Sequence, residues 1–244
     1  MTVTSEAHEG FTSSHRVIGR LAALSVFALG VAYAIVTALG FLSLESPQDP
    51  IGPPYVTLME LLILPLAALY LVAMVAVHAY ARPEAKAYSL IALAFMTISV
   101  GITTSVHFVI LSVGPQLEAT GQSWVPVVIS FRWPSILYTL DILAWDWFFA
   151  LSLLFASVAF TDGTLERAVR LLLIVSGVLS LAGLVGVPLS DMQIRNIGIV
   201  GYAVVSPVAF LLIGILFGRQ RTAADSRGHR GETHSSADHS STAE

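Results

Sequence analysis

Six long apolar segments set the architecture that this chain can adopt. Each is long enough to cross a hydrocarbon core of roughly 30 Å as a helix, which takes about 20 residues. They are predicted at residues 17–42, 54–81, 87–113, 134–160, 165–187 and 193–218. Hydrophobic residues make up 55% of the chain and charged residues only 11%, which is too little polar surface for a soluble domain. The sequence therefore predicts an all-α membrane protein, a six-transmembrane-helix bundle.

The distribution of basic residues predicts how this bundle is oriented. With the N-terminus inside, all twelve Lys and Arg residues except Arg132 and Arg195 fall in cytoplasmic segments. Multi-pass proteins keep positive charge on the cytoplasmic side, so both termini are predicted to be cytoplasmic. We expect a cytoplasmic N-terminal segment at 1–16, the transmembrane domain at 17–218 and a disordered cytoplasmic tail at 219–244. This pattern predicts that the chain is a multi-pass protein of the cell membrane.

Composition also narrows the partners and cofactors. The chain has no cysteine, which excludes disulfides, thiolate metal sites and cysteine nucleophiles. Lys86 is the only lysine and falls in a predicted loop, so a retinal Schiff base inside the bundle is excluded. Basic residues are few and scattered, so no nucleic-acid surface is expected. The expected partner is the lipid bilayer, no cofactor is predicted, and the oligomeric state stays open.

Five ionisable side chains lie inside the predicted spans, at Glu60, His78, His107, Asp141 and Asp146. Burial of such groups in hydrocarbon costs several kcal/mol of free energy, so they usually face the bundle interior, a partner or a polar cavity. The helical rise places Glu60, His107 and Asp141 at a similar depth, roughly 10 Å below the outer boundary. These three residues, contributed by three helices, form the predicted polar layer.

Neighbouring residues are expected to complete this candidate buried polar site. They lie within one turn of the layer, or at the outer start of the sixth segment: Thr103, Tyr138, Arg195 and Asn196. Arg195 and Asn196 are candidates for a counter-charge or a hydrogen-bond donor, since no Lys or Arg is predicted at the depth of the buried acids. Asp146 and His78 are secondary candidates, because Asp146 faces another side of its helix and His78 lies near the cytoplasmic end.

Two further segments bear on the site. Small residues recur along the fifth segment at Ser176, Gly177, Ser180, Gly183 and Gly186, which indicates a close-packing face. The longest connection, at 114–134, is predicted to be a loop that either covers the polar layer or anchors the chain at the membrane interface.

Three classes of function fit this pattern. The layer can bind a proton, a cation or a hydrophobic small molecule, for transport or sensing. Alternatively, a small intramembrane enzyme can use Glu60 or Asp141 as acid and His107 as base on a lipid or isoprenoid-like substrate. The third class is a non-catalytic structural or assembly protein. A divalent metal on Glu60, His107 and Asp141 is a further alternative, because imidazole and carboxylates together ligate zinc, iron or manganese.

Overall fold

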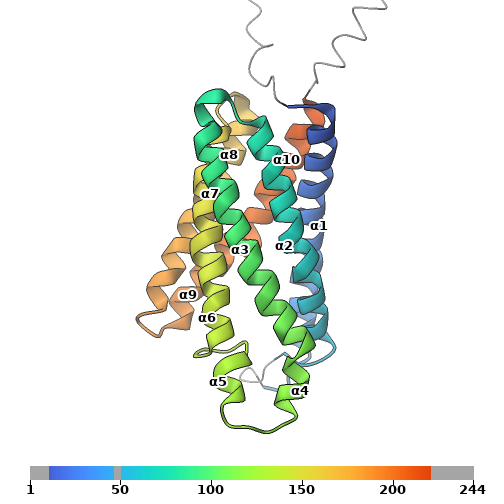
Figure 1. Cartoon of the computed structure of the whole chain (residues 1–244), viewed down its shortest axis with the longest axis vertical. Helices are drawn as coiled ribbons and strands as arrows, with labels where there is room; N and C mark the ends of the chain where they lie inside the picture. Colours follow the sequence, from blue (N-terminus) through green and yellow to red (C-terminus); the bar gives the residue numbers. More distant parts are fainter. Residues whose placement is uncertain (1–10, 47–50, 221–244) are drawn as a thin grey trace, which may run out of the picture.

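The computed structural model describes residues 11–46 and 51–220, and in them six helices are long and apolar enough to cross a membrane (Figure 1). These helices are Ser13–Leu42, Tyr55–Tyr80, Pro83–Ser112, Ile136–Ala159, Gly163–Gly186 and Met192–Arg219. The predicted six-span bundle is thereby confirmed, and each end lies within a few residues of its predicted place. The disordered tail predicted from 219 falls outside the described residues beyond Gln220 and stays a prediction there.

The first three spans are regular helices and the last three are composite. The regular ones are α1 (Ser13–Leu42), α2 (Tyr55–Tyr80) and α3 (Lys86–Ser112), with the short 3-10 turn η1 (Pro83–Ala85) leading into α3. The fourth span consists of α6 (Ile136–Ile142), the π-helical turn η2 (Leu143–Phe149), α7 (Ala150–Ala156) and η3 (Ser157–Ala159). The fifth is α8 (Gly163–Gly183) followed by η4 (Leu184–Gly186). The sixth joins α9 (Met192–Ile199), a second π-helical turn η5 (Val200–Val205) and α10 (Ser206–Arg219).

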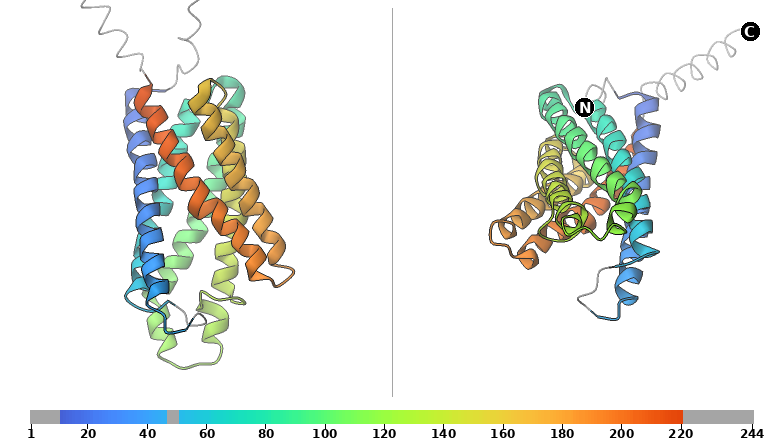
Figure 2. Two further views of the ribbon diagram at one scale, coloured as in Figure 1. Left: turned by 180° about the vertical axis from the view of Figure 1, so that it is seen from behind. Right: turned by 60° about the horizontal axis from the view of Figure 1, so that its bottom comes forward.

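The spans pack in chain order and close into a ring. α1 packs on α2, α2 on α3, α3 on the fourth span, the fourth span on α8, and α8 on the sixth span, whose α10 returns to α1 (Figure 2). The two ends of the helical region meet, since Arg16 Nη1 donates to the Gln220 carbonyl at 3.0 Å. Both therefore lie at one end of the bundle, called the terminal end below, and the α3–α6 connection lies at the other (Figure 1).

The connection predicted as a loop at 114–134 carries two short helices. They are α4 (Gly114–Glu118) and α5 (Val125–Ile129), and each has a proline in its first turn. Proline at this position forfeits no helical hydrogen bond, and its fixed φ suits a helix start. This segment is therefore a folded cap on one end of the bundle.

An aromatic cluster fills the centre of the bundle. The Tyr70 ring makes edge contacts with Trp145, Phe149 and Phe210, at centroid distances of 6.1, 5.0 and 4.7 Å. Its hydroxyl lies 2.7 Å from Ser206 Oγ, so its one polar atom is paired. Buried tyrosine normally finds such a partner. The cluster joins α2, the fourth span and α10.

The terminal end is closed by a polar contact between α2 and the start of α8. Glu166 is 8% exposed and accepts a hydrogen bond from the Tyr80 hydroxyl. Its other oxygen accepts the backbone N–H groups of Thr161 and Asp162 at 2.9 and 2.8 Å. Arg82 forms an ion pair with Asp162 beside it. The turn before α3 is thus tied to the turn before α8.

Hydroxyl groups from neighbouring helices bind the two π-helical turns. Ser99 donates to the Ala144 carbonyl of η2 at 2.9 Å, and Ser176 donates to the Gly201 carbonyl of η5 at 2.8 Å. Isolated π turns inside helices are rare overall, but those that occur are often found at functional sites. Here both occur in spans that carry the ionisable residues.

Proline explains where the second π turn ends. The Ser206 N–H bonds to the carbonyl of Gly201, five residues back, as a π turn requires. The next donor in that register would be Pro207, which has no N–H. The Ser206 hydroxyl instead donates to the Tyr202 carbonyl at 2.7 Å, so that oxygen is not left unpaired.

Candidate functional site

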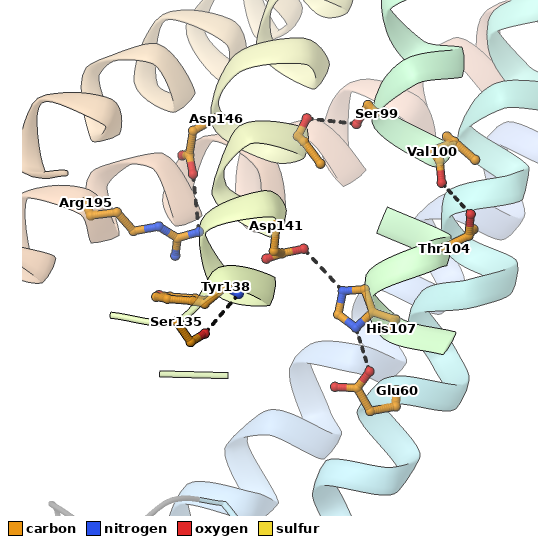
Figure 3. A network of polar contacts seen from close by, with 11 residues as sticks. Glu60, Ser99, Val100, Thr104, His107, Ser135, Tyr138, Asp141, Asp146 and Arg195 are labelled. Carbon is orange, nitrogen blue, oxygen red and sulfur yellow. Dashed lines mark hydrogen bonds and ion pairs between the residues drawn. The ribbon is translucent and has the colours of Figure 1, made fainter. Parts of the chain in front are cut away.

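The three residues of the predicted polar layer are in direct contact. His107 of α3 lies between two carboxylates, with Nδ1 2.6 Å from Glu60 Oε2 on α2 and Nε2 3.3 Å from Asp141 Oδ1 on α6 (Figure 3). Their side chains are 4%, 8% and 6% exposed, respectively. Three spans thus meet at one imidazole, and Glu60, His107 and Asp141 are called the triad below.

The charges of the triad do not cancel. A neutral imidazole donates from only one ring nitrogen, and only an imidazolium donates from both. With His107 as imidazolium and both acids ionised, the triad has one negative charge in excess. A buried net charge is strongly unfavourable in a membrane interior. The triad is therefore electrically neutral only when one of its carboxyl groups also carries a proton, or when a cation joins it.

A buried ion pair lies beside the triad. Arg195 Nη2 on α9 is 3.2 Å from Asp146 Oδ2 on η2, and the two side chains are 2% and 0% exposed (Figure 3). The guanidinium carbon also lies 5.2 Å from the ring centre of Tyr138 and 5.7 Å from that of Tyr202. Arginine over aromatic faces in a dry site gains cation–π attraction.

This pair corrects one prediction from the sequence. The sequence predicts Arg195 at the outer start of the sixth segment and predicts no Lys or Arg at the depth of the buried acids. The structure puts Arg195 inside the bundle because α9 packs closely on the end of α8. It lies 3.2 Å from Asp146, where it can act as the counter-charge for which it was a candidate.

Glycine contacts make this close packing possible. A Cβ on Gly198 would lie 1.9 Å from Asp146 Oδ1, so only glycine leaves room for that carboxylate. A Cβ on Gly183 or Gly186 would lie 2.8 Å from the Arg195 carbonyl or 2.5 Å from its backbone nitrogen. The small residues of the fifth span therefore bring the α9 backbone against α8. Gly198 was not singled out from the sequence, although its glycine spacing with Gly201 is the available signal.

Of the remaining predicted residues, Thr103 belongs to the site, whereas Asn196 and His78 do not. Thr103 is 1% exposed and lies on the His107 face of α3, within the site. Asn196 is exposed and takes no part. His78 lies near the terminal end of α2, with Nδ1 2.9 Å from Ser89 Oγ, and does not join the triad.

Phe131 covers the triad and belongs to the 114–134 connection, for which covering the polar layer was one of two predicted roles. It lies between α5 and α6, with its ring 5.5 Å from the His107 ring and 5.1 Å from the Tyr138 ring. The ring is 40% exposed. A side chain that touches His107 and also reaches the surface stands between the triad and the α4–α5 end. The one available signal was its position in the longest connection.

Two observations concern ligands at the triad. Within residues 11–46 and 51–220, no three His, Asp or Glu side chains are arranged to hold a metal ion. His107 directs one nitrogen at each acid, so the three groups do not surround a common point. An open pocket of about 390 Å³ lies between α5 and the start of α6. Its walls are formed by Val127, Pro134, Ser135, Ile136, Thr139 and Leu140.

Comparison with known protein families, with curated proteins and with solved structures finds no match for this chain. Its function is therefore inferred from the chemistry of the site.

Proposed function

We propose that this polytopic membrane protein takes up and releases a proton at the triad, as the proton site of a carrier or a sensor. The observation that carries the proposal is one buried imidazole placed between two buried carboxylates. Because an additional proton on one of its carboxyl groups cancels the charge of the triad, gain or loss of that proton changes the net charge of a buried site. Such a change biases the surrounding helices toward another arrangement.

The short contact in the triad favours a proton over a metal ion. Nδ1 of His107 and Oε2 of Glu60 are 2.6 Å apart, which suits a charge-assisted hydrogen bond. Two ligands of one tetrahedral zinc ion, each about 2.0–2.2 Å from the metal, lie farther from each other than that. A metal would have to push His107 and Glu60 apart.

Other titratable groups face the triad and Asp146 from the surrounding helices. They are Tyr33 of α1, Tyr138 of α6, Arg195 of α9 and Tyr202 of η5. Arg195 is the only permanent positive charge among them. Proton release from the triad therefore leaves an excess of negative charge that these neighbours do not cancel.

An intramembrane enzyme has less support. Acid–base catalysis needs a substrate atom within hydrogen-bond reach of the imidazole or a carboxyl group. The pocket between α5 and α6 is lined by residues outside the triad, and most of them are apolar. No wall of that pocket is formed by Glu60, His107 or Asp141.

Infrared difference spectroscopy on the purified protein tests the proposal, because a protonated carboxyl group has a C=O stretching band that a carboxylate lacks. We expect one buried band that disappears as the pH is raised. Glu60→Gln or Asp141→Asn should abolish or shift it, whereas Glu118→Gln, at an exposed acid of α4, should leave it unchanged. If no carboxyl band changes with pH, or if neither triad substitution changes the band, the triad has a purely structural role.

Reconstitution separates a carrier from a sensor. In proteoliposomes with an internal pH dye, a carrier moves protons or a co-substrate down an imposed pH gradient, and His107→Gln stops that flux. A sensor changes its tryptophan fluorescence over the same pH range without flux.

A further inference from the structure

Buried polar atoms without a hydrogen bond gather in one region of the described chain. They are Thr103 Oγ1, Asp141 Oδ1, both carboxylate oxygens of Asp146, Ser180 Oγ, and Nε and Nη2 of Arg195. Asp141 Oδ1 and Arg195 Nη2 lie at ion-pair distances, 3.3 Å from His107 and 3.2 Å from Asp146, but without hydrogen-bond geometry. All other buried side-chain nitrogen and oxygen atoms of residues 11–46 and 51–220 have a partner.

These atoms are neighbours in space. A Cβ on Gly198 would touch Asp146 Oδ1 at 1.9 Å and the Ser180 carbonyl at 3.3 Å, and one on Gly201 would lie 2.8 Å from Ser180 Oγ. Asp146 and Ser180 thus flank the same glycine pair. Asp141 lies in the same span as Asp146 and is drawn between His107 and Arg195 (Figure 3).

Thr103 extends the region to α3. One turn before it, Ser99 donates to the Ala144 carbonyl, and one turn after it, His107 faces Asp141. Residues four apart share a helix face. Thr103 therefore faces the fourth span between Ala144 and Asp141, at the level where Asp141 Oδ1 lies.

The mixture of groups that lack a hydrogen bond indicates which ligand fits. Guanidinium nitrogens only donate, carboxylate oxygens only accept, and the two hydroxyls do both. A metal cation would be repelled by Arg195, and an anion by the two aspartates. Water both donates and accepts, and in proteins it satisfies buried polar groups of this kind. The region suits water molecules that carry protons between the acids.

We infer that Asp146 is a second proton-binding site, joined to the triad through internal water. The inference rests on the proposed function of the triad. In the transfer, the O–H bond of protonated Asp141 breaks and its proton passes to a water molecule, which gives a proton to the Asp146 carboxylate. No other reactant is needed and the net charge is unchanged. Asp146 lies five residues farther along the span than Asp141. The transfer therefore moves the proton about 7 Å away from the α4–α5 end of the bundle.

Arg195 gives this transfer a counter-charge in both states. Before transfer its guanidinium lies against the Asp146 carboxylate at 3.2 Å. After transfer Asp146 is neutral and Asp141 carries the charge. Tyr138, whose ring lies 5.2 Å from the guanidinium carbon, is about one helical turn from Asp141, and the charges of both Asp146 and Asp141 act on Arg195.

Two charge-conserving variants test the water link. Thr103→Val and Ser180→Ala each remove one hydroxyl from the region and leave every acid in place. In a carrier, proton flux into proteoliposomes should fall about tenfold or more in each variant, as for loss of a proton-transfer group. In a sensor, which has no flux, the infrared bands described below are the readout. Ser152→Ala is the matched control, because Ser152 is a buried serine with its own partner, the Ala92 carbonyl at 2.7 Å, and this variant should retain wild-type flux.

Infrared spectra supply a second readout that does not depend on flux. Spectra in ¹⁸O-labelled water should show bands of internal water that weaken in Thr103→Val and Ser180→Ala. After transfer, neutral Asp146 should add a C=O band of its own to the triad band, and Asp146→Asn should remove that added band while the triad band persists. If these substitutions leave flux, water bands and carboxyl bands unchanged while Glu60→Gln abolishes the triad band, the second site is refuted and the triad proposal stands. If Glu60→Gln also changes nothing, both fail.

Discussion

Gly198→Ala directly tests the packing that holds the Asp146–Arg195 pair. The added Cβ would lie 1.9 Å from Asp146 Oδ1, and ordinary van der Waals contact begins at 3.4 Å. Asp146 is fully buried, so its carboxylate can retreat only by leaving Arg195 or by pushing α9 away from the fourth span.

The expected loss follows from three contributions. Alanine in place of glycine inside a helix stabilises by about 1 kcal/mol. Overpacking of a well-filled core destabilises by about 1–3 kcal/mol. Separation of a buried ion pair costs about 3–5 kcal/mol when it is complete. With the pair loosened and not fully broken, Gly198→Ala should destabilise the protein by roughly 2–4 kcal/mol.

Gly101→Ala is the matched control, because Gly101 lies inside α3 and a Cβ there meets nothing within 4 Å. It should leave stability unchanged or raise it by up to about 1 kcal/mol. Unfolding in mixed micelles with increasing SDS, followed by far-ultraviolet circular dichroism and tryptophan fluorescence, measures both variants. Equal stability of Gly198→Ala and Gly101→Ala would refute the close contact between α9 and Asp146.

Two other substitutions probe the ends of the bundle. Phe131→Ala uncovers His107, so hydrogen–deuterium exchange of its ring should accelerate at least several-fold by mass spectrometry, whereas Trp124→Ala, at an exposed residue of the same connection, should not change it. Tyr80→Phe keeps the ring but removes the hydrogen bond to Glu166, so unfolding should become easier by about 1–3 kcal/mol, and an unchanged midpoint would show that the contact adds nothing.

Most of the fold could be predicted from local properties of the chain. The length of each apolar segment decides whether it can cross a bilayer, and each span satisfies its own backbone hydrogen bonds. The helical rise likewise converts sequence position into depth. That is why Glu60, His107 and Asp141 could be placed at one level, and why the six spans were found within a few residues of their ends.

The pairings around this level depend on which helix faces meet, and a single sequence does not specify them. Arg195 lies at the start of a span, where arginine normally reaches the aqueous boundary, yet glycines on α8 bring its backbone inside. Glu166 opens a helix, where carboxylates are common, yet Tyr80 from α2 covers it. The hydrophobic length of the segments determined that six helices cross the membrane. The interhelical contacts, which depend on the side chains of two or more spans at once, decided which partner each buried charge has.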